Sequence, residues 1–197
     1  MTAVILPKFP RPNRMGVDYL DFGISQRGAS SLRVDRPGNR HRLTFIWPIE
    51  TMDAEIAAKF ISRLKRGKRR DVQIDILLPQ PQGSPGSPVV NGAGQSGTSI
   101  AVRGLTPGYT VRDDYWLTII EADGTAYLHS AVEPVRANAS GQATIQIEPP
   151  LRAPFADGAV IQMARPFIQG ELVGETFSYA YESLRRVPLA ITIEERQ

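Results

Sequence analysis

Two proline-rich stretches limit what this chain can fold into. The first, PQPQGSPGSP, runs from Pro79 to Pro88, and the second, EPPLRAP, runs from Glu148 to Pro154. Proline has a fixed φ and no backbone N–H, so neither stretch is expected to continue a helix or a central strand. We interpret both as joints that separate the intervening segment from the rest of the chain and allow it to move independently.

Four short runs between the joints have the composition of strands and are separated by turn signals: 98–105, 115–123, 125–132 and 143–148. Asp123 and Gly124 form a two-residue hairpin signal, and Pro107 with Gly108 marks another turn. This spacing is typical of a small β barrel or sandwich. We therefore expect an inserted small β-barrel domain at 83–150.

One helix is expected, at 53–66. Thr51 or Asp53 can cap its start, and Gly67 stands where a left-handed stop belongs. Apolar residues recur along it at helical spacing: Ile56, Ala57, Phe60, Ile61 and Leu64. Strand-like runs precede it at 43–47 and follow it at 71–78, an order that lays the helix across a sheet.

Three further strand candidates follow the second joint, at 159–164, 176–181 and 189–194. About 45 residues would make a marginal domain alone, so we expect them to complete the N-terminal sheet. The prediction is a mainly β protein with one α-helix, in which a discontinuous domain at 1–82 plus 151–197 carries the inserted barrel.

The charge is unevenly distributed. Residues 1–80 have a net charge of +7, whereas residues 81–197 have −4. The densest basic run, which we call the basic strip, consists of Arg63, Lys65, Arg66, Lys68, Arg69 and Arg70. It begins in the last turn of the predicted helix, where cations offset the helix dipole. A solvated or subunit-contacting face is favoured over a nucleic-acid site, because no aromatic residues are interleaved for base stacking.

Little in the sequence indicates catalysis. With no cysteine, thiolate chemistry and cysteine metal sites are excluded. The two histidines lie outside any constellation: we expect His41 at the surface or a strand edge, and His129 as a satisfied strand residue. The chain contains no G-x-S-x-G. Glu194 and Glu195 are expected to face solvent. We expect no enzyme activity, no cofactor and no metal.

Aromatic residues are concentrated in the predicted insertion: Tyr109, Tyr115, Trp116 and Tyr127. Aromatic rings on a small β module can stack against sugars, so these four residues define a possible glycan platform. The other interpretation, which we favour, is that Trp116 and some of the tyrosines fill the barrel core.

Two phrases of the sequence resemble siphophage tail-tip proteins. The first pattern is G-Q-x-G-x-x-L followed by a G-L-x-P-G turn, and it is matched by Gly94, Gln95, Gly97, Gly104, Leu105, Pro107 and Gly108. The second is I-x-P-P-L-R followed by A-D-G-A, matched by Glu148 to Arg152 and Ala156 to Ala159. The sequence departs from the pattern at Ile100 and Tyr109. The resemblance is specific for residues 91–160 and architectural elsewhere.

The resemblance to the distal tail protein family implies a tail-tube-like β sandwich with one helix and an added small β domain. It further implies a structural virion component that forms a ring, usually hexameric, between the tail tube protein and the baseplate, hub or fibre proteins. Such a protein would be made in the host cytoplasm and located in the virion tail. We expect the proline-broken segment at 7–12 to reach a neighbouring subunit, and the basic strip to meet an acidic tail protein.

Two other functions compete with this one. The aromatic set favours a tail-tip carbohydrate-binding module that contacts a host surface glycan, and the N-terminal charge favours a nucleic-acid binder. No run approaches the length of a membrane span, and the first residues lack the pattern of a signal peptide, so we expect no membrane anchor.

Overall fold

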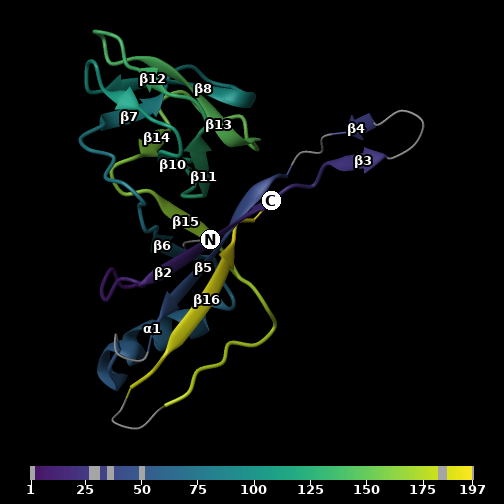
Figure 1. The fold of residues 1–197 in the computed structure, drawn as a ribbon, viewed down its shortest axis with the longest axis vertical. Coiled ribbons are helices and arrows are strands. Elements are labelled where there is room, and N and C mark those ends of the chain that lie inside the picture. The colour runs from purple at the N-terminus through teal and green to yellow at the C-terminus, as the bar shows by residue number, and fades with distance from the viewer. Residues whose placement is uncertain (1–2, 27–31, 35–37, 49–51, 182–185, 197) are drawn as a thin grey trace.

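The computed structural model describes residues 3–26, 32–34, 38–48, 52–181 and 186–196. The fold is mainly β with one helix, as predicted, and has two parts: a six-stranded sheet and a closed six-stranded barrel (Figure 1). A two-stranded hairpin projects from the sheet.

The six-stranded sheet combines strands from both ends of the chain. Its order is β1 (Val4–Ile5), β6 (Val72–Asp75), β15 (Phe167–Leu172), β16 (Leu189–Glu194), β5 (Arg40–Trp47) and β2 (Arg14–Leu20). All neighbours are antiparallel except β1 and β6, which are parallel. The predictions at 43–47, 71–78 and 189–194 correspond to β5, β6 and β16. No strand forms at 176–181, which was predicted to be one, and β15 was not predicted.

The helix α1 (Ala54–Gly67) confirms the prediction at 53–66. Asp53 is its N-cap and accepts a hydrogen bond from the Ile56 amide at 2.9 Å. The other candidate cap, Thr51, lies outside the described residues. Gly67 was wrongly predicted to be a left-handed stop, because it belongs to the helix and its φ is not positive. A Cβ there would lie 2.3 Å from Val72 Cγ2, so steric exclusion explains this glycine.

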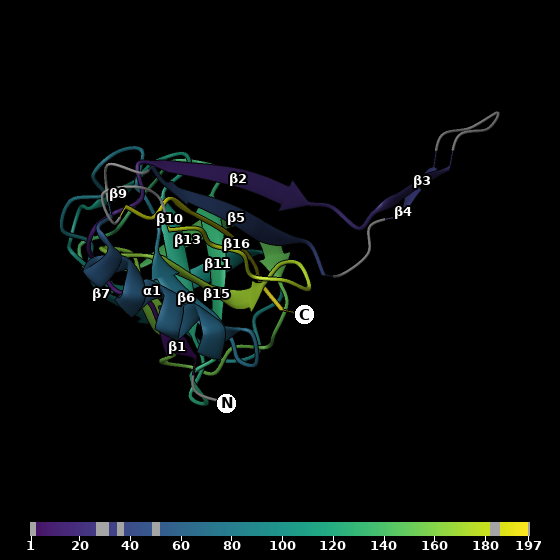
Figure 2. The ribbon, with the colours of Figure 1, turned by 90° about the horizontal axis from the view of Figure 1, so that it is seen from below.

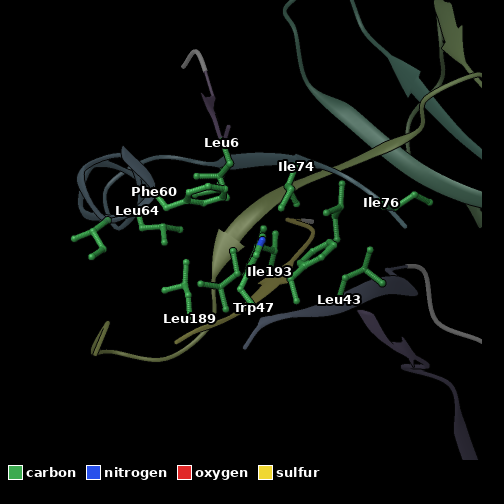
Figure 3. Packing of buried hydrophobic residues seen from close by; sticks show 14 of the residues in the cluster. Leu6, Leu43, Trp47, Phe60, Leu64, Ile74, Ile76, Leu189 and Ile193 are labelled. Carbon is green, nitrogen blue, oxygen red and sulfur yellow. The ribbon is translucent and has the colours of Figure 1, made fainter. Parts of the chain in front are cut away.

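One apolar cluster joins the helix to the sheet (Figure 3). Phe60 and Leu64 of α1 pack with Trp47 of β5, and the rings of Trp47 and Phe60 lie 5.3 Å apart. Trp116 and Leu128 from the barrel belong to the same cluster. The barrel therefore shares its packing with the sheet along one side.

The barrel closes in the order β10 (Trp116–Ile120), β11 (Ala126–Ala131), β13 (Ala143–Leu151), β8 (Gly97–Leu105), β7 (Gly86–Val90) and β14 (Val160–Gln162), with β14 pairing again with β10. A separate pair, β9 (Thr110–Val111) and β12 (Val135–Arg136), lies beside it. The strand predicted at 159–164 thus closes the barrel and does not extend the sheet. Both proline stretches contribute strands: β7 contains Pro88, and β13 runs through Pro149 and Pro150.

The predicted turns are present with one change in length. Tyr109 N–H donates to the Thr106 carbonyl at 2.9 Å across the Pro107–Gly108 turn. In the β10–β11 hairpin, the Glu121 amide donates to the Thr125 carbonyl at 2.8 Å, so three residues, not two, separate the last paired residues. Gly124 has a φ of 87°, which favours glycine.

The residues that precede the proline-broken segment at 7–12 pack into the sheet. Val4 and Leu6 are buried, and the amides of both donate hydrogen bonds to the segment that contains β6. The chain then enters β2, which pairs with β5 through seven residues. Beyond β2 it forms the projecting hairpin of β3 (Ile24–Gln26) and β4 (Leu32–Val34), which extends away from the body in both views (Figures 1 and 2).

Candidate functional site

Three side chains of the basic strip contact other described residues, and three do not. Arg63 Nη1 donates to the Ile5 carbonyl at 2.7 Å, Lys65 Nζ lies 5.3 Å from the centre of the Tyr179 ring, and Lys68 Nζ donates to the Gly174 carbonyl. The other three, Arg66, Arg69 and Arg70, are exposed, and their side chains make no hydrogen bond or ion pair with a described residue. These three therefore present their charge to solvent.

The four aromatic residues of the possible glycan platform do not form an exposed surface. Tyr115 and Trp116 are buried. Tyr109 is partly buried, and its hydroxyl donates to the Gln82 carbonyl. Tyr127 packs edge-on against Phe155, with ring centres 5.4 Å apart. The three tyrosines pack in or against the barrel core, as that interpretation had some of them do, whereas Trp116 packs into the apolar cluster of the sheet and not into the barrel core.

The most distinctive polar arrangement lies where the barrel meets the sheet, and we call it the junction: Tyr19, His41, Trp116, Leu128, His129, Arg152 and Glu195. Glu195, just beyond β16, is buried there. Its carboxylate accepts hydrogen bonds from the His41 amide at 2.9 Å, the Leu128 amide at 2.7 Å and Arg152 Nη2 at 2.7 Å. One side chain thus connects β5 of the sheet with β11 and the end of β13 in the barrel.

Glu195 and its neighbour Glu194 were predicted to face solvent, and both predictions are wrong. Glu194 accepts hydrogen bonds from Arg40 and Arg42 on β5. Burial alone would raise the pKa of Glu194, but these two guanidinium groups outweigh it and lower the pKa. Burial raises the pKa of Glu195, against the opposing effects of Arg152 and the two amides. No sequence signal indicated that Glu195 reaches the barrel.

His41 was predicted at the surface or a strand edge, but it is buried in the junction on β5, which lies between β16 and β2. Its ring centre lies 4.9 Å from that of Trp116 and 5.8 Å from that of Tyr19. Burial lowers the pKa of His41 to about 4. The alternation that makes Leu43, Phe45 and Trp47 face the core continues back to His41, so extending the predicted strand by two residues would have found it.

Tyr19 and His129 complete the junction. The Tyr19 hydroxyl donates to Glu148 Oε2 at 2.7 Å, and burial raises the pKa of Tyr19 to about 12. His129 is a strand residue, as predicted, but it is buried and only partly satisfied: Nδ1 lies 2.8 Å from the Pro149 carbonyl. Burial lowers its pKa to about 3. Its Nε2, the Trp116 indole nitrogen and Arg152 Nε are buried and have no hydrogen-bond partner in the described part of the chain.

Two buried polar side chains hold the crossing segments between the two parts. Gln82 donates to the Trp116 and Met163 carbonyls and accepts from the Trp116 amide, at 2.7 to 2.8 Å. Thr118 Oγ1 donates to the Phe167 carbonyl at 2.7 Å and accepts from the Phe167 amide at 2.8 Å. The first proline-rich stretch is therefore fastened to the barrel at Gln82 and does not serve as a free linker.

The projecting hairpin and the strand leading into it carry exposed apolar side chains. We call this surface the arm, and its large apolar residues are Val17, Tyr19, Phe22, Ile24 and Val34. Among the described strands, none pairs with the outer edge of β2.

At the other end of the sheet, a groove of about 440 Å³ lies between the N-terminal prolines and β6.

No group of three or more His, Asp or Glu residues in the described part of the chain is placed to hold a metal ion. No helix among these residues is both long and apolar enough to cross a membrane. No family model matches the sequence, and no curated protein matches it.

Proposed function

We propose that the protein is a structural subunit of a phage-type tail, of the distal tail type, that forms a ring between the tail tube and the tip or baseplate. The observation that supports this most is the arm. Ile24 and Val34, which pair across the hairpin, are 41% and 49% exposed. Exposed apolar side chains beside a strand edge that no described strand pairs with favour association with another chain.

The arrangement of the sheet favours a cyclic assembly over a two-fold dimer. Strand β2 and the arm are at one end of the sheet, whereas β1 and the proline-lined groove are at the other. A contact between two different surfaces of identical subunits is heterologous, and it generates a ring when the rotation closes. Six copies is the number implied by the resemblance to distal tail proteins.

The exposed arginines of the basic strip supply a surface for a second kind of partner. Arg66, Arg69 and Arg70 extend from the end of α1. In the proposed assembly they meet acidic groups of the tail tube protein or of a hub or fibre protein. The buried positions of Tyr115 and Trp116 give the carbohydrate-binding alternative no support.

The mass in solution tests the proposal. Light scattering of the full chain at several concentrations, with negative-stain imaging of large species, should reveal a closed ring, with six copies expected. A monomer at every concentration would contradict self-assembly. A glycan array probed with the full chain would then test the binding alternative, because a fragment of residues 83–150 would lack the closing strand β14.

A further inference from the structure

Two histidines from different parts of the molecule are buried in the junction. His41 is on β5 of the sheet and His129 is on β11 of the barrel, and they are 3% and 0% exposed. Of their four ring nitrogens, Nδ1 of His129 contacts the Pro149 carbonyl at 2.8 Å, and the other three have no partner within hydrogen-bonding distance among the described residues. Protonation would therefore add charge to two imidazoles that have no carboxylate hydrogen-bonded to them.

The charged groups facing the two imidazoles are few. Arg152 and Glu195 lie on this side of the sheet, with Tyr19 and its partner Glu148 at the margin. Arg40, Arg42 and Glu194 form a separate cluster on the alternate face of β5. Arg152 is already paired with Glu195. If both histidines were protonated, two more buried cations would join Arg152 in the junction, where Glu195 is the one buried carboxylate named among these groups, and such an excess of positive charge is costly away from water.

Opening the junction would relieve this cost. The Trp116 indole N–H, Arg152 Nε and three imidazole nitrogens are buried without hydrogen-bond partners, and each could bind water if the barrel moved away. Thr118, which pairs with Leu128 across β10 and β11, holds Phe167 of β15 through two hydrogen bonds, and Gln82 holds the crossing segment to the Trp116 backbone. These anchors lie beside the junction, so the barrel would turn about them when the contacts of Glu195 open.

We propose that the junction is an acid-sensitive hinge: when His41 and His129 take up protons, the barrel swings away from Glu195 while the barrel and the sheet each stay folded. This hinge does not require the protein to form a ring.

The direction of the pH effect follows from the histidines. Burial, reinforced by Arg152, lowers the pKa of His41 to about 4 and that of His129 to about 3, whereas an exposed histidine has a pKa near 6.5. Docking is therefore strongest above pH 6.5 and weakens as the pH falls. At pH 5, protonation of each histidine in the open state raises the ratio of open to docked molecules roughly thirtyfold above its value at a pH well above 6.5. Burial raises the pKa of Glu195, so its protonation favours docking and offsets part of this effect.

Hydrogen exchange of two backbone amides in the full chain tests the proposal. The amides of His41 and Leu128 both donate to the Glu195 carboxylate and so report the docked state. Ile119 and Ile145, inside the barrel, serve as references. Between pH 7.5 and pH 5, we expect the protection factors of the two junction amides to fall at least tenfold more than those of the references. In His41→Phe/His129→Phe this difference should disappear.

Three outcomes would overturn the proposal: unchanged protection at the junction, an equal loss at the references, or a selective loss that persists in the double variant. If the double variant does not fold, His41→Phe alone replaces a ring whose nitrogens have no hydrogen-bond partner, and it should remove about half of the effect on a logarithmic scale. Glu195→Gln serves as a matched control, since it should lower protection already at pH 7.5 and leave the histidine-dependent response in place.

Discussion

Arg152 Nη2 lies 2.7 Å from Glu195 Oε1 in the interior of the molecule, where the two side chains are 6% and 1% exposed. Arg152 follows the barrel strand β13, and Glu195 follows β16 of the sheet. Removing one member of the pair leaves the other as an unpaired buried charge, which is costly. The importance of the pair for the free energy of unfolding is therefore seen most clearly when only one member is lost.

Removing either member should destabilise the protein strongly. We expect Arg152→Ala or Glu195→Ala to lower the free energy of unfolding by about 3–5 kcal/mol, measured by urea denaturation. Arg152→Met/Glu195→Leu should cost less than the sum of the single changes, since neither charge is then left unpaired. Lys59→Ala breaks an exposed pair with Glu55 and should have little effect. Equal losses in all these variants would contradict a special role for the buried pair.

The tight contact of Gly67 with Val72 gives a second prediction. A Cβ at Gly67 would overlap Val72 Cγ2, so Gly67→Ala should destabilise the protein by about 1–3 kcal/mol. Gly67→Asn should be at least as harmful, although asparagine would be tolerated at a left-handed stop. Adding Val72→Ala to Gly67→Ala should recover part of the loss. Thermal unfolding of these three variants and of Val72→Ala alone measures this coupling, and an additive result would argue against the steric explanation.

Local patterns predicted the elements whose packing is local. The helix was predictable because Phe60 and Leu64 recur at its period and Asp53 caps it. Strand β16 was predictable from its alternation. Which sheet or barrel a strand joins was harder to predict. The run at 159–164 was correctly predicted to be a strand, but its pairing with β10 depends on how the barrel closes. Proline was weighted too heavily, because β7 and β13 both accommodate it.

The junction could not be predicted from the sequence. Glu195 has the composition of a solvated terminus, and only its position just past β16, which pairs with β5, brings it to the His41 amide. The Leu128 amide and Arg152 reach it only once the barrel is docked. The arm was also missed, since neither β3 nor β4 has a long alternating pattern.

The pH dependence of stability should reveal the ion pairs of Glu194. Arg42 and Arg40 outweigh burial and lower the pKa of Glu194 in the folded state. The ion pairs therefore stabilise the folded protein above the unfolded pKa of about 4.5, and this stabilisation is lost as the pH falls through the folded pKa. Glu194→Gln should therefore lower the urea midpoint at pH 7 and have a smaller effect at pH 3. An equal effect at both pH values would indicate that packing, rather than charge, dominates at this position.

The arm should be required for self-association. Ile24→Asp/Val34→Asp places charge on its exposed apolar face and should reduce the mass measured by light scattering, because both side chains would have to be desolvated at an interface. Circular dichroism should show unchanged secondary structure. Val160→Asp is a matched control, since Val160 is 52% exposed but lies on the barrel strand β14. If the control dissociates the assembly as much as the arm variant does, the arm is not the contact.

Under the proposed function, the exposed arginines of the basic strip should be required for binding an acidic tail protein, but not for folding. Arg66→Glu/Arg69→Glu/Arg70→Glu reverses three charges that make no hydrogen bond or ion pair with a described residue, so the unfolding midpoint should change little. Joining an acidic partner should fail, because opposite charges become like charges at the contact. Completion of tails in an assembly reaction that depends on this protein measures the effect.

Arg112→Glu, an exposed charge reversal elsewhere on the chain, controls for net charge. Normal tails from the triple variant would show that this surface contacts no partner, whereas failure of both variants would trace the defect to overall charge.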